Sequence, residues 1–209
     1  MRIIHLFADL CNLYGDYGNV SGLKRMLENK GQNVDVEHQS IDDEIDVSGA
    51  DLVFIGSATE RNQKVALNYL QSYKENIKTA LDNGTVILAT GNSFEIFGQI
   101  VTDCDGIKHE GLSFFPYETV EGKERIVTDS LCTTSLCGGD IIGFVNKASL
   151  TTGATSPLFD VKQGSGNGKD DNKEGVHYGN FYGTHLIGPV LIRNPQLCEY
   201  FADMLIKKQ

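Results

Sequence analysis

The chain has 209 residues, enough for one compact domain whose apolar core needs no disulfide bonds. Hydrophobic residues make up 40% of it and charged residues 22%, which excludes a disordered chain. Acidic residues outnumber basic ones 28 to 18 and the lysines are scattered, so the basic surface of a nucleic-acid-binding protein is missing and no nucleic-acid partner is expected.

Apolar runs alternate with amphipathic stretches through the first half of the chain, a pattern that indicates βαβ units and a mainly parallel sheet. A tight turn and a helix beginning near Ser93 follow the last of these strands. Strand, sharp turn and helix is the arrangement that presents a nucleophile in several hydrolase folds. In chain order, the expected elements before that turn are a strand over Arg2–Ala8, a helix over Val20–Lys30, strands over Asn33–His38 and Asp51–Ile55, a long helix over Arg61–Leu81 and a central strand over Thr85–Ala89.

The second half of the chain predicts an antiparallel extension of the sheet. Residues 107–149 contain short β-branched runs and turns, with a hairpin expected at Glu121 and Gly122. The polar, glycine-bearing segment Gln163–Gly175 is expected to form an exposed flexible loop. A last helix, opened by Pro195 and running to about Ile206, closes the domain. The fold class is therefore α/β, a mainly parallel sheet flanked by helices.

Other motifs argue against targeting signals and metal sites. The start, MRIIHLF, has the pattern of a strand broken by Asp9, not of a secretory signal, and no run approaches membrane-spanning length. The five cysteines are an odd number without metal-ligand spacing, which predicts reduced thiols in the cytoplasm. His38, His109 and His177 form no metal pattern, and Asp170–Asn172 lacks the closing glutamate of a calcium loop. We expect no metal and no cofactor.

Five segments, spread in order over nearly the whole chain, carry distinctive motifs. They are Asn12–Asn19 (NLYGDYGN), Asp51–Gln63 (DLVFIGSATERNQ), Leu88–Gly98 (LATGNSFEIFG), Gly143–Thr151 (GFVNKASLT) and Tyr182–Pro195 (YGTHLIGPVLIRNP). Together they resemble the cobyric-acid-synthase-like class I glutamine amidotransferases, and among them the glutaminase subunits of lipid II isoglutaminyl synthase. This resemblance implies a single glutamine amidotransferase-like, flavodoxin-like domain over residues 1–209.

The resemblance also implies a chemistry that this sequence lacks the groups to perform. Enzymes of the family attack the side-chain amide of glutamine with a thiolate, a histidine acts as base, and backbone amides hold the oxyanion. The nucleophile position falls on Gly91, and the base position falls on Ile187. The position of a further arginine falls on Leu150, and the position of a histidine falls on Lys147. We therefore predict a loss of glutaminase activity.

Other positions of the family pattern are altered as well. Ser57 and Ala58 stand where glycines are typical, and Glu95 replaces the usual glutamine of the elbow. His185 lies two residues before the base position, either as a displaced functional group or as an ordinary packed or exposed histidine. Ser93, two residues past Gly91, is either a substitute nucleophile or the cap of a helix.

Two functions stay open. The first is a non-catalytic subunit that binds an ATP-dependent, Mur-ligase-like partner, as the resemblance implies, for cell-wall precursor amidation or a related pathway. The second is an enzyme of altered chemistry or a binding module, in which a pocket still takes a small amide or amino acid. The candidate pocket residues are Gly56, Ser57, Asn92, Ser93 and His185.

Overall fold

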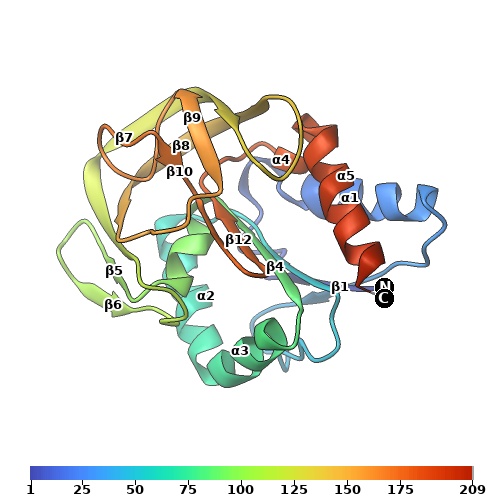
Figure 1. The fold of residues 1–209 in the computed structure, drawn as a ribbon. Coiled ribbons are helices and arrows are strands. Elements are labelled where there is room, and N and C mark those ends of the chain that lie inside the picture. Colours follow the sequence, from blue (N-terminus) through green and yellow to red (C-terminus); the bar gives the residue numbers. More distant parts are fainter. Residues whose placement is uncertain (209) are drawn as a thin grey trace.

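The computed structural model describes residues 1–208, which form two packed sheets and the helices around them (Figure 1). The first sheet has the order β11-β12-β4-β3-β1-β2, and only the edge strand β11 is antiparallel to its neighbour. The predicted mainly parallel sheet is confirmed. Its strands are β1 (Arg2–Leu6), β2 (Asp35–Gln39), β3 (Leu52–Ile55), β4 (Val86–Thr90), β11 (Val176–Tyr178) and β12 (Phe181–Thr184).

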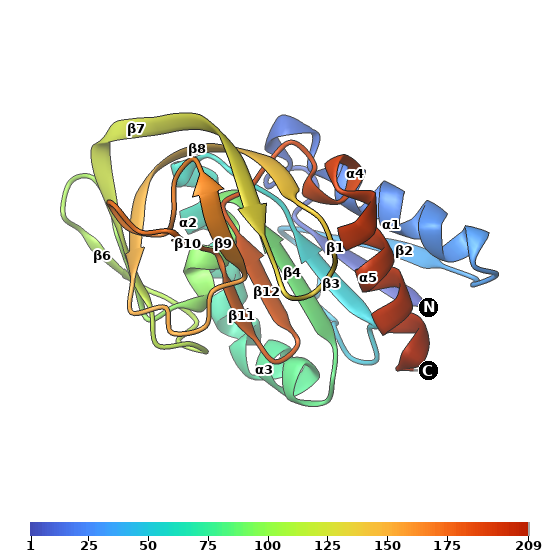
Figure 2. The same cartoon turned by 45° about the horizontal axis from the view of Figure 1, so that its top comes forward.

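Helices cover both faces of this sheet, with α1 and α5 together on one side and α2 and α3 on the other (Figure 2). Neighbouring residues of a strand point into different cores, since Ile3 packs with the α1 and α5 side and Ile4 with the α2 side. The helices are α1 (Tyr17–Asn29), α2 (Glu60–Leu70), α3 (Lys74–Asp82), α4 (Val190–Arg193) and α5 (Pro195–Lys207), with 3₁₀ turns η1 (Leu13–Gly15), η2 (Gln71–Tyr73) and η3 (Gly91–Phe97).

The second sheet is the predicted antiparallel extension, with the order β10-β9-β7-β5-β6 and β8 paired to β7. Long strands β7 and β8 form a twisted ribbon that stands beside the first sheet (Figure 2). The strands are β5 (Ile100–Thr102), β6 (Lys108–Glu110), β7 (Glu118–Thr133), β8 (Ile141–Thr152), β9 (Phe159–Gln163) and β10 (Lys173–Glu174).

The hairpin expected at Glu121 and Gly122 is wrong. β7 continues through these residues, and the chain turns back only between β7 and β8, over residues 134–140. At 122–125 the pairing register of β7 shifts against β8 instead. A glycine among charged residues serves a bulge as well as a turn, so its local signal does not separate the two.

Two more local predictions are corrected. The single helix expected over 61–81 is α2 and α3 with the 3₁₀ turn η2 between them, where the side chain of Gln71 donates to the carbonyls of Glu110 and Gly111. The helix expected near Ser93 begins at Gly91 and is a 3₁₀ helix. Apolar spacing of three or four residues fits both helix types, so the sequence pattern could not distinguish them.

The segment Gln163–Gly175 is not simply an exposed loop. Asn167 is buried and its side chain bonds both backbone groups of Gly175, while Glu174 is fully buried in β10. Polar composition indicated exposure, but these polar groups find partners inside the fold.

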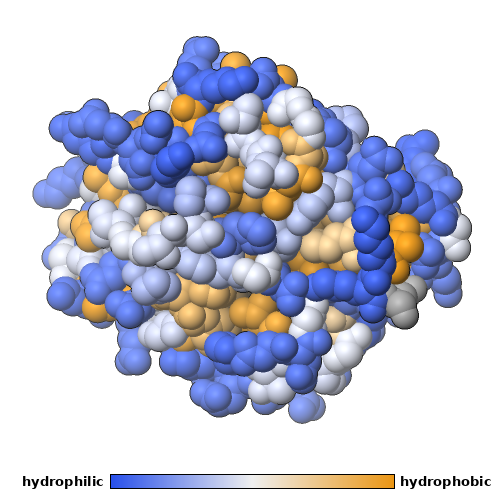
Figure 3. Space-filling view, in the orientation of Figure 1, coloured by the Kyte–Doolittle hydropathy of each residue, from blue (hydrophilic) through white to orange (hydrophobic). Residues whose placement is uncertain are grey.

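On the face seen in Figure 3, hydrophilic side chains predominate and apolar side chains appear in separate groups. Within residues 1–208, no helix has both the length and the apolar character needed to cross a membrane.

Candidate functional site

The sharp turn after β4 is the centre of the candidate site. β4 ends at Thr90, and Gly91, the first residue of η3, takes φ +62°. A positive φ suits glycine, because it has no Cβ to clash with the backbone. The strand, sharp turn and helix expected from the sequence are therefore present, with a residue without a side chain at the apex.

Ser57 and Ile187 close the space in front of Gly91. A Cβ placed on Gly91 would lie 2.2 Å from the Cβ of Ser57 and 3.3 Å from Cγ2 of Ile187. Ile187 is held by its N–H, which donates to the carbonyl of Phe144 at 2.9 Å. Positions 57, 91 and 187 thus meet in space, and Ser57 fills the room that a side chain at position 91 would need.

Backbone amides near the turn already have partners. The N–H of Ser57 donates to Oδ2 of Asp16 at 2.6 Å, and the N–H of Ala58 donates to Oδ1 of Asn92 at 3.0 Å. Asp16 also accepts from the hydroxyl of Thr90 at 2.8 Å. Two amides of the loop after β3 are therefore not free to hold an oxyanion, which catalysis of this type requires.

Asp16 is the group that ties the loop after β3 to the elbow. It is fully buried, and burial raises the pKa of its carboxyl group, although the hydrogen bonds from Ser57 and Thr90 oppose that rise. One side chain from the loop before α1 thus links β3 and β4 at their carboxyl ends, where open α/β sheets bind ligands.

A cavity of about 240 Å³ opens at this point, between the elbow and the β7–β8 ribbon. Leu150 lies outside its lining, while Arg125 of β7 is part of it. That Leu150 stands at the family's arginine position stays a prediction. Arg125 lies beside Asn146 of β8, whose Oδ1 accepts from its guanidinium at 2.9 Å. Among the lining residues are Ser57, Gly91, Asn92, Arg125, Lys147 and Ile187.

Glu95, the fifth residue of η3, is a buried polar residue of the cavity lining. Its carboxylate accepts from Nε2 of Gln63 at 2.7 Å, from Nε2 of His185 at 3.2 Å and from the hydroxyl of Ser149. Burial raises the pKa of Glu95, but the hydrogen bonds from His185, Ser149 and Gln63 together lower it by more than burial raises it. The pKa of Glu95 is therefore below the usual range. The carboxyl group is therefore ionised.

His185 lies behind Glu95 and not in the cavity lining. Its Nδ1 is 3.4 Å from Oε1 of Glu174, outside hydrogen-bond geometry, while its backbone N–H donates to the same oxygen at 2.7 Å. The ring of Phe94 packs edge-on at 4.6 Å between centroids. His185 is a packed histidine held between two carboxyl groups, so of the two alternatives for it the packed one describes its position.

Two further candidate pocket residues are also behind the lining. The buried hydroxyl of Ser93 donates to the carbonyl of Gly56, and neither residue lines the cavity. Ser93 does not cap the helix through its side chain, since no side-chain cap bond is made at the start of η3. Ser57 and Asn92 do line the cavity.

Lys147 is a buried amine at the position where the family pattern has a histidine. Its Nζ donates to the carbonyls of Gly166 at 2.6 Å and Asn167 at 3.2 Å. Burial lowers the pKa of this amine, and the charges of Glu174 and Glu95 partly offset that effect. The lysine thus connects the cavity wall to the segment before β10, a link that no sequence pattern signalled.

None of the five cysteines lines the cavity. Burial raises the pKa of Cys11 to about 12 and the pKa values of Cys132 and Cys198 to about 11. A thiol with such a pKa contains almost no thiolate near neutral pH, and the thiolate is the reactive form. Within residues 1–208, no group of three or more metal-binding side chains was found either.

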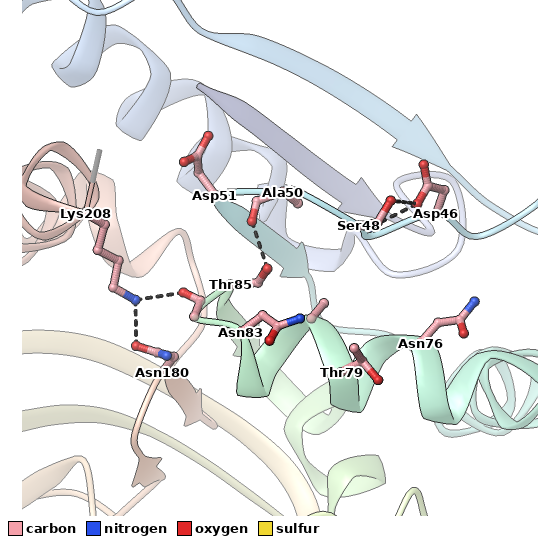
Figure 4. A pocket seen from close by; sticks show the side chains of 13 residues that line it. Asp46, Ser48, Ala50, Asp51, Asn76, Thr79, Asn83, Thr85, Asn180 and Lys208 are labelled. Atoms are coloured by element: carbon pink, nitrogen blue, oxygen red, sulfur yellow. Dashed lines mark hydrogen bonds between the residues drawn. The ribbon is translucent and has the colours of Figure 1, made fainter.

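A larger hollow, of about 680 Å³, lies at the opposite edge of the first sheet (Figure 4). Asp51 and Thr85, which precede β3 and β4, mark this edge, and Lys208 reaches across to the carbonyl of Gly84 and the side chain of Asn180. Ligands in open α/β sheets bind at the carboxyl ends of the strands, so the smaller cavity at the elbow is the better candidate.

The fold with this elbow is that of the class I glutamine amidotransferases. A crystal structure of a glutamine amidotransferase is 13% identical with a TM-score of 0.65, and the match covers 97% of this chain and 98% of that one. The structure of PurLQS from Thermotoga maritima is 12% identical with a TM-score of 0.58, and the match covers 99% and 97%. At these identities the likeness concerns the fold alone.

Residues 2–195 match the CobB/CobQ-like glutamine amidotransferase domain, and the chain belongs to this family. It is 30% identical over 209 residues to the GatD subunit of lipid II isoglutaminyl synthase (glutamine-hydrolyzing) from Staphylococcus aureus, across 100% of this chain and 86% of that protein. The Streptococcus pneumoniae GatD subunit is 31% identical over 212 residues, across 100% and 82%. The resemblance inferred from the five segments is thereby confirmed.

Proposed function

We propose that this chain is a glutamine amidotransferase-like subunit without glutaminase activity, which acts with an ATP-dependent, Mur-ligase-like partner in the amidation of a cell-wall precursor. The observation that carries the proposal is the elbow. Gly91 offers no atom to attack an amide carbon, so no thioester forms there. The side chain of Ile187, at the base position, cannot accept a proton.

The surroundings of the elbow support the same conclusion. Ser57 fills the space of a nucleophile's side chain, and the amides of Ser57 and Ala58 are already bonded within the chain. Several independent elements of the chemistry are thus missing together, whereas the fold around them is intact. Such a pattern fits a protein kept for its surface or its cavity better than one kept for turnover.

The partner is inferred from the relatives. Both GatD relatives are named as subunits of a lipid II isoglutaminyl synthase. The whole of this chain aligns with 86% of one relative and 82% of the other. An amide-forming ligase needs ammonia, and a glutaminase normally supplies it. With a subunit that does not hydrolyse glutamine, the complex would take free ammonia from solution.

Ammonia release from glutamine tests the first part of this proposal. We expect the purified chain to release no ammonia above background, alone or with the ligase that co-purifies with it, and the complex to form its amide from ammonium chloride but not from glutamine. A glutamine-mimicking electrophile should leave the mass of the chain unchanged. Turnover that disappears in Ser93→Ala or His185→Ala would contradict the proposal, as would an acyl adduct anywhere on the chain.

The cavity favours a second candidate function, the binding of a small amide or amino acid without hydrolysis. It keeps about 240 Å³ of space lined by Arg125, Glu121 and Asn92, which offer both charges and an amide. Calorimetric titration with glutamine, glutamate and asparagine checks this. Binding that is lost in Arg125→Gln would favour a binding module, and no heat with any of the three would exclude it for these ligands.

A further inference from the structure

One stretch of β7 beside the cavity has no partner residues in the register with β8. Glu121 pairs with Ser149 and Ile126 pairs with Lys147, so the four residues 122–125 stand opposite Ala148 alone. All four are exposed, and the first is Gly122. We call residues 122–125 the strap. A segment outside the paired register, with exposed side chains, opens at lower free-energy cost than the paired strands around it.

Helix α2 holds both ends of the strap through one of its faces. Glu60 and Lys64 are four residues apart and therefore lie on the same side of the helix. Lys64 forms an ion pair with Glu121 at one end of the strap, and Glu60 forms an ion pair with Arg125 at the other. Two charged contacts thus attach the strap to a helix of the first sheet's layer.

The two ion pairs differ in exposure. The side chains of Lys64 and Glu121 are 14% and 5% exposed, whereas those of Arg125 and Glu60 are 41% and 40% exposed. Exposed ion pairs contribute little and are screened by salt, while breaking a buried pair is costly. The Glu121 end is therefore the fixed end, and the Arg125 end is the one that releases first.

The releasable end lies at the mouth of the cavity. Glu60, Glu121 and Arg125 all line the cavity. Arg125 also donates to Asn146, which in turn donates to the hydroxyl of Tyr14 at 2.8 Å. Polar contacts therefore run from α2 through the strap to β8 and on to the loop after β1, across the opening.

Of the strap, Arg125 alone lines the cavity. We propose that the Glu60–Arg125 ion pair is a latch that holds Arg125 at the edge of the cavity, and that the cavity widens when this pair breaks and the strap pivots at Glu121. The device controls entry to the cavity whatever the cavity does, so it does not rest on the absence of glutaminase activity. Its weakness is functional, because a latch of one exposed ion pair opens readily and is sensitive to ionic strength.

Hydrogen exchange of the full chain tests the latch, with Glu60→Gln as the main variant. We expect exchange at residues 122–126 to rise about two- to fivefold, the range for the loss of one exposed ion pair. Asp140→Asn is the matched control, because Asp140 forms an ion pair of similar exposure with Lys162 away from the cavity and should leave these residues unchanged. Raising the salt concentration to about 1 M, where screening reaches about 3 Å, should reproduce the effect in the unaltered chain.

A second measurement reports on the cavity itself. In the double variant Gly91→Cys and Ser57→Gly, labelling of the new thiol by a small thiosulfonate, followed by mass spectrometry, measures access. Adding Glu60→Gln should speed this labelling by the same factor, and the charge exchange Glu60→Arg with Arg125→Glu should return it to the starting rate. Unchanged exchange and labelling in Glu60→Gln, or a charge exchange that restores neither, would overturn the latch. If the double variant does not fold, hydrogen exchange in the single variants decides alone.

Discussion

Two positions of the short helix η3 show opposite outcomes of sequence change. At its first residue, Gly91, no side chain remains, and the neighbouring Ile187 and Ser57 leave the turn without a nucleophile or a base. At its fifth residue, Glu95, a charged group sits fully buried with three hydrogen-bond donors around it.

The difference teaches what each kind of group requires. Catalytic groups can be lost one at a time without unfolding the chain, because their removal leaves no buried charge unpaired. A buried carboxylate is kept only if its partners are kept with it, since an unpaired buried charge is very costly. Glu95 and Lys147 stand where the resemblance implies other residues, and they lie in one region of the fold together with His185 and Glu174.

The largest expected effect comes from removing Glu95. We expect Glu95→Leu to lower the free energy of unfolding by about 3–5 kcal/mol, because it leaves Gln63 and His185 facing an apolar side chain. Urea denaturation at pH 7 measures this. Glu199→Gln removes an exposed carboxylate paired with Lys30 and should cost far less. Equal losses for the two variants would refute the distinction between a buried, hydrogen-bonded carboxylate and an exposed one.

A second prediction compares the two buried histidines. His5 on β1 has no hydrogen-bond partner for Nε2, and burial, with a smaller contribution from His38, lowers its pKa from 6.5 to about 4. Below pH 6.5 His5 becomes protonated in the unfolded chain, whereas in the folded chain it stays neutral down to about pH 4. The free energy of unfolding should therefore decrease by about 3 kcal/mol as the pH falls from 6.5 to 4. Above pH 6.5 this histidine contributes no pH dependence.

Thermal denaturation between pH 7 and pH 4 follows this loss. His5→Leu should flatten the decrease, while Glu95→Gln, which keeps a hydrogen-bonding side chain beside His185, should leave the contribution of His5 in place. A pH profile identical in His5→Leu and in the unaltered chain would show that another group is responsible.

The smallest of these effects concerns the elbow. Gly91→Ala adds a Cβ at 2.2 Å from that of Ser57, on a residue with positive φ, and should lower stability by about 1–3 kcal/mol. Adding Ser57→Gly removes the closest contact and should recover part of that loss, although the Cα of residue 57 stays 2.9 Å from the new Cβ. That contact and the penalty of about 1 kcal/mol for a left-handed alanine remain. Denaturation curves of the three variants measure the recovery. A strictly additive pair of substitutions would mean that Ser57 does not fill the space in front of Gly91.

Local patterns predicted the parts of the fold that depend on nearest neighbours. The alternation of apolar runs and helical stretches indicated the parallel sheet, and the run TVILA followed by a glycine-containing turn located the elbow. These features need only the period of the backbone and the requirements of a tight turn. The resemblance to the family, and not a local pattern, related positions 91 and 187 to one site.

Other features depended on contacts between segments far apart in the sequence. Arg125 lines the cavity because contacts of β7 with α2 and β8 bring it there, and no sequence pattern singled it out. The bulge at 122–125 and the burial of Glu174 were missed for the same reason. Exposed polar segments and bulged strands have similar compositions, and only their partners tell them apart.

The sequence alone thus indicated the family and placed Gly91 and Ile187 at the expected nucleophile and base positions, since both follow from which residue type stands at which position. Tertiary packing decided that Ser57 occupies the vacated space, that the amides beside it are bonded to Asp16 and Asn92, and that His185 is held between Glu95 and Glu174. Burial and pairing are properties of the surroundings of a side chain, and those surroundings exist only once distant segments have come together.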